Sequence, residues 1–110
     1  MLNNFSGLTP MEKEIDSAKA EKFFNEAKNI VEASKKNSKT GSRDEIYALI
    51  EEITNYYQFH STTYRSQLFL LQDFLSKCIE SLVNNNNDGF VQLEVFLKTK
   101  NDFVRKGWLS

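Results

Sequence analysis

Residues 46–82, IYALIEEITNYYQFHSTTYRSQLFLLQDFLSKCIESL, decide the fold class of this 110-residue chain. Large apolar side chains recur in this stretch at intervals of three or four residues, as on one face of an α-helix. No glycine or proline interrupts it. We therefore expect an all-α fold with this apolar stripe in its core. The stripe comprises Ile46, Leu49, Ile50, Ile53, Tyr57, His60, Tyr64, Leu68, Leu71, Leu75, Cys78 and Leu82.

The phase of the stripe favours one long helix over residues 43–83, because the apolar residues stay within one sector of the helical wheel. The alternative is a break near residues 60–63, His-Ser-Thr-Thr, where weak helix formers and capping residues coincide. The long helix would give a three-helix bundle with a long central helix. The break would give a four-helix up-down bundle.

Two further helices flank this stretch. Thr9-Pro10-Met11-Glu12 has the form of a capping box with proline at the first helical position, which predicts a helix over residues 10–36. The apolar residues of this helix change face, which predicts a kink or break near residues 16–18. The asparagine-rich run at 84–89 ends the central region, and a last helix follows over residues 89–106.

Length and composition indicate a single helical domain over residues 1–110, with residues 1–9 as a flexible arm. The single cysteine excludes an internal disulfide and a cysteine-based zinc site. The longest aliphatic or aromatic run, residues 68–71, is too short to span a membrane. The N-terminus has no secretory signal, so we expect a cytoplasmic protein. No internal repeat is evident.

Charge is distributed unevenly along the chain. Residues 35–43 carry four bases and no acid, whereas residues 44–88 carry a net charge of −5. A nucleic-acid-binding protein ordinarily has a broad basic face, because affinity comes from many phosphate contacts. We therefore expect no nucleic-acid partner. Contact with phosphate or nucleic acid through the 35–43 loop is an alternative.

Residues 84–96 resemble a calcium-binding EF-hand loop. With Asn84 at position 1, Asn86, Asp88 and Gly89 fall at positions 3, 5 and 6 of such a loop. Position 12 is a valine, which cannot supply the carboxylate of an EF-hand. The resemblance implies a degenerate divalent-cation site, with Asn84, Asn86 and Asp88 as weak candidate ligands. The simpler interpretation is an asparagine-rich connection between helices.

His60 and Cys78 are the only histidine and cysteine, and both lie on the apolar stripe. On a continuous helix their Cα atoms would be about 27 Å apart, too far for a catalytic dyad. A turn at residues 60–63 would allow contact, but nothing in the sequence indicates it. We expect no enzyme activity, no catalytic residue and no cofactor.

The expected function is that of a small non-enzymatic module for protein–protein interaction, of the adaptor, chaperone or immunity-protein type. A layer two helices thick leaves apolar surface uncovered, which predicts a protein partner or a homodimer. Residues 90–108 are amphipathic and basic, and peripheral membrane contact through them is an alternative. The aromatic residues predicted as anchors are Tyr56, Phe59, Phe69, Phe74 and Trp108.

Overall fold

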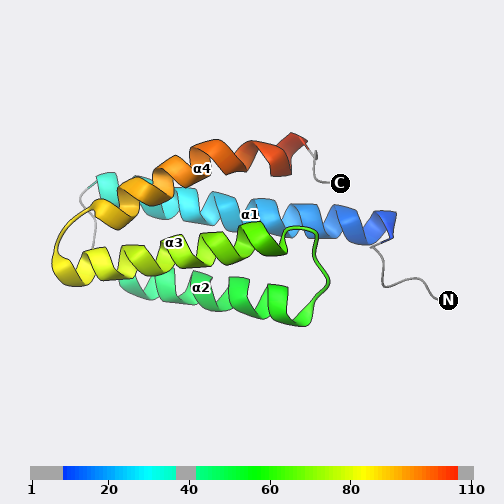
Figure 1. Ribbon diagram of the computed structural model, residues 1–110, viewed down its shortest axis with the longest axis horizontal. Coiled ribbons are helices and arrows are strands. Elements are labelled where there is room, and N and C mark those ends of the chain that lie inside the picture. Colours follow the sequence, from blue (N-terminus) through cyan, green and yellow to red (C-terminus); the bar gives the residue numbers. More distant parts are fainter. Residues whose placement is uncertain (1–8, 37–41, 107–110) are drawn as a thin grey trace.

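The structure is a computed structural model that describes residues 9–36 and 42–106. Its four helices run alternately in opposite directions (Figure 1). The all-α class is therefore confirmed, with the four helices of the stated alternative, and the described residues contain no strand. The helices are α1 (Pro10–Lys35), α2 (Ser42–Phe59), α3 (Arg65–Asn84) and α4 (Asp88–Lys106).

The central helical region is a hairpin and not one continuous helix, because α2 and α3 are separated by a turn at residues 60–64. Inside the turn, the Thr62 hydroxyl accepts a hydrogen bond from the backbone N–H of Tyr64 at 3.1 Å. The hydroxyl and the backbone N–H of Thr63 donate instead to Asp16 of α1. Such side-chain bonds compete with helical hydrogen bonds and fix the reversal where the sequence is weakest in helix formers.

The first helix begins as the sequence predicts. The Thr9 hydroxyl accepts from the Glu12 backbone N–H, and the Glu12 carboxylate accepts from the Thr9 backbone N–H, which completes a capping box. The break that was one of the two expectations near residues 16–18 does not occur, since α1 is one helix from Pro10 to Lys35. Its buried face starts with Asp16, one turn before Ala20, while Met11 and Ile15 are more than half exposed. A buried carboxylate therefore explains the apparent change of face.

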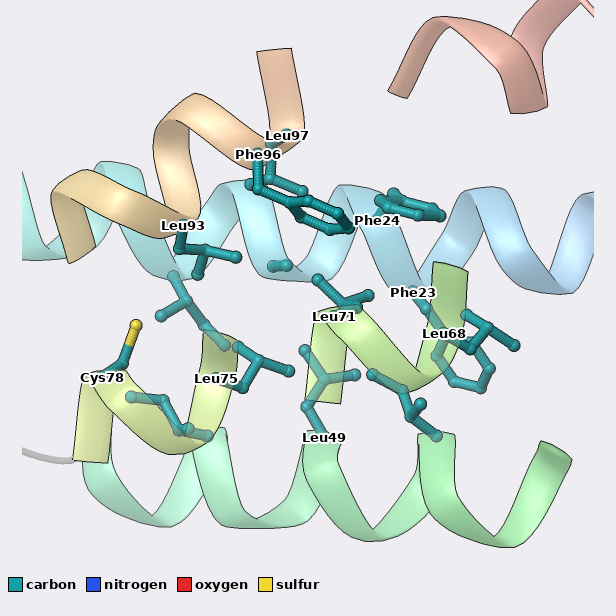
Figure 2. Close-up of a cluster of buried hydrophobic side chains, with 14 of the residues drawn as sticks. Phe23, Phe24, Leu49, Leu68, Leu71, Leu75, Cys78, Leu93, Phe96 and Leu97 are labelled. Atoms are coloured by element: carbon teal, nitrogen blue, oxygen red, sulfur yellow. The ribbon is translucent and has the colours of Figure 1, made fainter. Parts of the chain in front are cut away.

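The core lies along the axis of the bundle, and Figure 2 shows side chains from all four helices meeting there. α1 packs against α2 and α4, and α3 packs against the same two helices. The apolar stripe of the central region is therefore covered within the chain. This closure removes the uncovered two-helix layer from which self-association was predicted. The labelled residues of Figure 2 are Phe23, Phe24, Leu49, Leu68, Leu71, Leu75, Cys78, Leu93, Phe96 and Leu97.

The contact between α3 and α4 depends on a close backbone approach at Gly89. A Cβ atom on this residue would lie 2.3 Å from the Lys77 carbonyl oxygen. The Gly89 N–H donates to the Ser81 hydroxyl at 2.7 Å. Further along, the rings of Phe74 and Phe96 stack with their centroids 4.8 Å apart. Gly89, which ends the asparagine-rich run, thus allows α4 to pack closely on α3.

Three expectations concern residues outside the part of the chain that the structure describes. They are the expected arm over residues 1–9 apart from Thr9, the 37–41 part of the basic loop, and the anchor Trp108. Among the described helices, none combines the length and the apolar character needed to cross a membrane.

Candidate interaction surface

The structure divides the four described anchor candidates into two pairs. Tyr56 and Phe74 are partly buried against the core, where Tyr56 faces α1 and Phe74 faces α4. Phe59 and Phe69 are 75% and 58% exposed. Phe59 is the last residue of α2, and Phe69 lies in the second turn of α3. Of the four, only Phe59 and Phe69 are largely exposed to solvent.

Asp16 forms the most highly connected polar cluster of the described bundle. It is 2% exposed, and its carboxylate accepts four hydrogen bonds from α2 and the α2–α3 turn. The Tyr56 and Thr62 hydroxyls donate to one oxygen at 2.6 Å each. The backbone N–H and hydroxyl of Thr63 donate to the other at 2.9 and 3.1 Å. The cluster ties the first third of α1 to the turn opposite.

This cluster holds the turn against α1. Each carboxylate oxygen of Asp16 accepts two hydrogen bonds from Tyr56, Thr62 and Thr63. Burial, together with the hydrogen bond to Asp16, raises the pKa of Tyr56 well above its ordinary value of 10.0. The phenol therefore stays protonated as a donor at neutral pH.

His60 and Cys78 are not brought together by the hairpin. His60 is exposed beside the turn, where its ring stacks on Tyr56 with centroids 5.0 Å apart. Cys78 is buried 13 residues beyond the start of α3, which is about 20 Å along the helix. Burial raises the pKa of its thiol from 9.0 to about 12, so the reactive thiolate is suppressed.

The asparagine-rich connection does not have the geometry of an EF-hand. Asn84 ends α3, Asn85 adopts the left-handed conformation at φ 59°, and Asp88 already belongs to α4. The Asn86 side chain accepts from the Asp88 backbone N–H at 3.1 Å, as a helix cap. The connection is therefore too short to be a twelve-residue loop. In residues 9–36 and 42–106, no three His, Cys, Asp or Glu side chains are grouped as metal ligands.

One described base of the basic loop, Lys35, is occupied by a contact within the protein. The Lys35 ammonium donates to the Glu94 carboxylate, which Lys98 also approaches at 3.9 Å. This hydrogen bond raises the pKa of Lys35 and lowers the pKa of Glu94. The charge of Glu94 on α4 is thus balanced by Lys35 of α1, which links the two helices.

The outer side of the α2–α3 hairpin presents two parallel ridges of side chains. Positions spaced by three or four residues share one side of a helix, and one such set on each helix lies beside the α2–α3 contact on its outer side. This contact is located by the interactions of Tyr57 with Phe69, at 6.3 Å between ring centroids, and with Gln72. We call these ridges the α2–α3 face; it consists of Tyr47, Glu51, Thr54 and Gln58 from α2, and Phe69, Asp73, Ser76, Glu80 and Val83 from α3.

The two ridges carry the same pattern at a spacing of 22 residues. Tyr47 corresponds to Phe69, and Glu51 corresponds to Asp73. Thr54 and Ser76 also correspond, and each hydroxyl donates to the backbone carbonyl four residues earlier in its own helix. Because α2 and α3 are antiparallel, the two copies of the pattern run in opposite directions along the face. The correspondence covers these three pairs and the arginine one turn before each aromatic residue, Arg43 and Arg65.

Charge on the α2–α3 face is unbalanced. Glu51, Asp73 and Glu80 are exposed, and none of them forms an ion pair with another described residue. Arg43 and Arg65 lie one turn before the aromatic residues, at opposite ends of the face. The Arg65 guanidinium is already engaged, since it donates to the Tyr57 carbonyl at 2.7 Å and lies over the Tyr57 ring. The middle of the face is therefore acidic.

Sequence reasoning identified Phe69 but missed Tyr47, Glu51 and Asp73, because these residues lie off the apolar stripe. The signal that identifies them is the 22-residue repeat. No protein-family model, curated protein or solved structure matches the chain.

Proposed function

We propose that this protein is a non-enzymatic protein–protein interaction module and that the α2–α3 face is its docking surface. The observation that carries the proposal is the pair of equivalent ridges, each with an exposed aromatic residue followed one turn later by an unpaired carboxylate. Tyr47 is 50% exposed and Phe69 is 58% exposed. Half-exposed aromatic residues on rigid helices are typical anchors, because ordering them costs little conformational entropy on binding.

The other ionisable groups support a binding role over catalysis. Asp16 is saturated with hydrogen bonds, and the Cys78 thiol is buried with a raised pKa. A single buried thiol also suits the reducing cytoplasm, where we place the protein. The exposed aliphatic residues Val91 and Val95 of α4 make a smaller surface without an aromatic residue in the described part of that helix face.

The proposal is tested by site-specific photo-crosslinking in the source cells. A benzoylphenylalanine replaces Phe69 in one variant and Tyr47 in a second. The matched control carries the same group at Val95, which is exposed to nearly the same extent as Phe69 but lies on α4. We expect a shared covalent adduct from positions 69 and 47 that position 95 does not give.

The captured protein is then purified and its affinity is measured by calorimetry. Phe69→Ala and Tyr47→Ala should each weaken binding by about tenfold, as expected for anchor residues, whereas Val95→Ala should not. All three side chains are at least half exposed, so the variants should stay folded. Equal adducts from positions 69 and 95, or unchanged affinity in both aromatic variants, would contradict the proposal.

A further inference from the structure

We infer that the α2–α3 face takes a basic amphipathic helix of a partner protein, lying along the α2–α3 contact between the two ridges. This inference rests on the proposed function and adds the chemistry of the partner. It is drawn from the spacing of the aromatic residues and from the charge between them.

The aromatic residues set the length and spacing of the occupant. The ring of Phe69 contacts that of Tyr57, and Tyr47 lies ten residues before Tyr57 on α2. At 1.5 Å per residue, the two exposed aromatic residues are about 15 Å apart along the bundle axis. A helix bridges this distance in about three turns. Its apolar residues would therefore contact the face at positions ten or eleven residues apart, with one or two more between them.

The carboxylates set the charge of the occupant. Glu51 and Asp73 lie on opposite ridges between the aromatic residues, and Glu80 lies near the Tyr47 end. Lys77 lies one helical turn from both Asp73 and Glu80, but its ammonium is over the ring of Phe74, 5.6 Å from the centroid, and it forms no ion pair with another described residue. Lysine or arginine side chains flanking the apolar stripe of a partner helix would pair with the carboxylates of both ridges.

The same charges argue against a second copy of this chain as the occupant. Face-to-face packing of two α2–α3 faces would place Glu51 and Asp73 of one copy against the same acids of the other. Like charges brought together in an interface are repulsive. The four-helix closure of the core also leaves no inner apolar stripe that a second copy is needed to cover.

The test uses three synthetic peptides about four helical turns long, with leucine at every third or fourth position. The remaining positions are lysine in the first peptide, glutamine in the second and glutamate in the third. Binding to the full-length protein is measured by calorimetry at low and high ionic strength. We expect the lysine peptide to bind at least about tenfold more tightly than the glutamine peptide, and to weaken as salt screens the charges.

Variants locate the binding on the face. Glu51→Gln and Asp73→Asn should each weaken the lysine peptide by about threefold, and Glu14→Gln, an exposed acid of α1, should not. Tyr47→Ala and Phe69→Ala should weaken all binding.

The outcomes separate the two proposals. If the glutamine peptide binds as tightly as the lysine peptide and still depends on the aromatic residues, the inferred charge is wrong and the docking surface stands. If the lysine peptide fails to bind, the inference is overturned. If it binds without depending on Tyr47 and Phe69, both proposals fall. A dimer seen by sedimentation and lost in Phe69→Ala would show that a second copy occupies the face.

Discussion

Replacing Gly89 by alanine tests the packing of α4 on α3, because the close approach predicts a lower free energy of unfolding where helix propensity alone predicts a higher one. In an exposed helical position, Gly→Ala stabilises a protein by about 1 kcal/mol, because alanine loses less backbone entropy. Gly89 is buried, and its new Cβ would lie 2.3 Å from the Lys77 carbonyl oxygen and 2.8 Å from the Cys78 backbone nitrogen. Normal carbon contacts need about 3.5 Å, so α4 must move away by about 1 Å.

The stability lost by overpacking at Gly89 should exceed the stability gained from the higher helix propensity of alanine. Overpacking of this kind costs about 3 kcal/mol at the upper end of its usual range. Moving α4 also lengthens the 2.7 Å hydrogen bond from the Gly89 N–H to the Ser81 hydroxyl, at a cost of about 1 kcal/mol. After the propensity gain, we expect Gly89→Ala to reduce the free energy of unfolding by about 3 kcal/mol.

Urea unfolding followed by circular dichroism measures this change. The midpoint should fall by about 1.5–2 M if the m-value stays near 1.5–2 kcal/mol/M. Gln92→Ala, at an exposed position of the same helix, is the control for propensity, and Ser81→Ala isolates the hydrogen bond. A midpoint for Gly89→Ala equal to or above that of the wild type would refute the close approach of the two helices.

Three further predictions concern the buried ionisable groups. Asp16→Ala leaves four donors without their acceptor and should cost about 3–5 kcal/mol in urea unfolding, against about 0.5 kcal/mol or less for the exposed control Glu14→Ala. Tyr56→Phe keeps its ring contacts but loses one bond to Asp16, and should cost about 1–2 kcal/mol. The native state keeps the Cys78 proton to about pH 12, whereas the unfolded state loses it near 9.0, so the unfolded state binds fewer protons and stability falls as the pH rises. We expect a loss of about 1 kcal/mol between pH 9 and 10, which Cys78→Ala should remove; a flat wild-type profile there would contradict the burial of the thiol.

Helix ends were predictable where a short sequence carries the whole physical cause. The capping box at Thr9 and Glu12 is local, and its two hydrogen bonds form as predicted. The stop at 84–89 is equally local, since asparagine readily adopts the left-handed conformation found at Asn85. The last helix was expected from residue 89 and begins at Asp88, which leaves too few residues for the EF-hand loop that the ligand pattern alone suggested.

The division of the central region could not be read from periodicity, and the repeat explains why. Twenty-two residues are about six helical turns, so two helices that carry the same pattern at this spacing have the same phase. The apolar stripe therefore keeps nearly the same helical phase on both sides of the turn at 60–64, although the chain reverses direction there. An unbroken phase is expected both for one long helix and for this hairpin. Comparing Arg43-x₃-Tyr47-x₃-Glu51 with Arg65-x₃-Phe69-x₃-Asp73 would have favoured the hairpin.

Asp16 was missed for a different reason. A charged residue on an apolar helix face ordinarily marks the edge of that face, because burying a lone carboxylate is costly. Here the cost is offset by donors that lie 40–47 residues away in the chain, on Tyr56, Thr62 and Thr63. No local pattern around residue 16 contains them. The burial of Asp16 can be predicted only when the turn that donates to it is known to pack against α1, and that packing follows from the topology of the bundle.

The closure of the bundle changes where function should be sought. On one continuous central helix, the apolar stripe would be the surface that needs a partner. Folded as a hairpin, the chain covers that stripe with its own α1 and α4. The repeat then leaves a second set of positions, headed by Tyr47 and Phe69, whose side chains stay at least half exposed outside that core. Phe69 packs against Tyr57 on one side only, so each of these two aromatic residues keeps open surface on which the proposed docking can be tested.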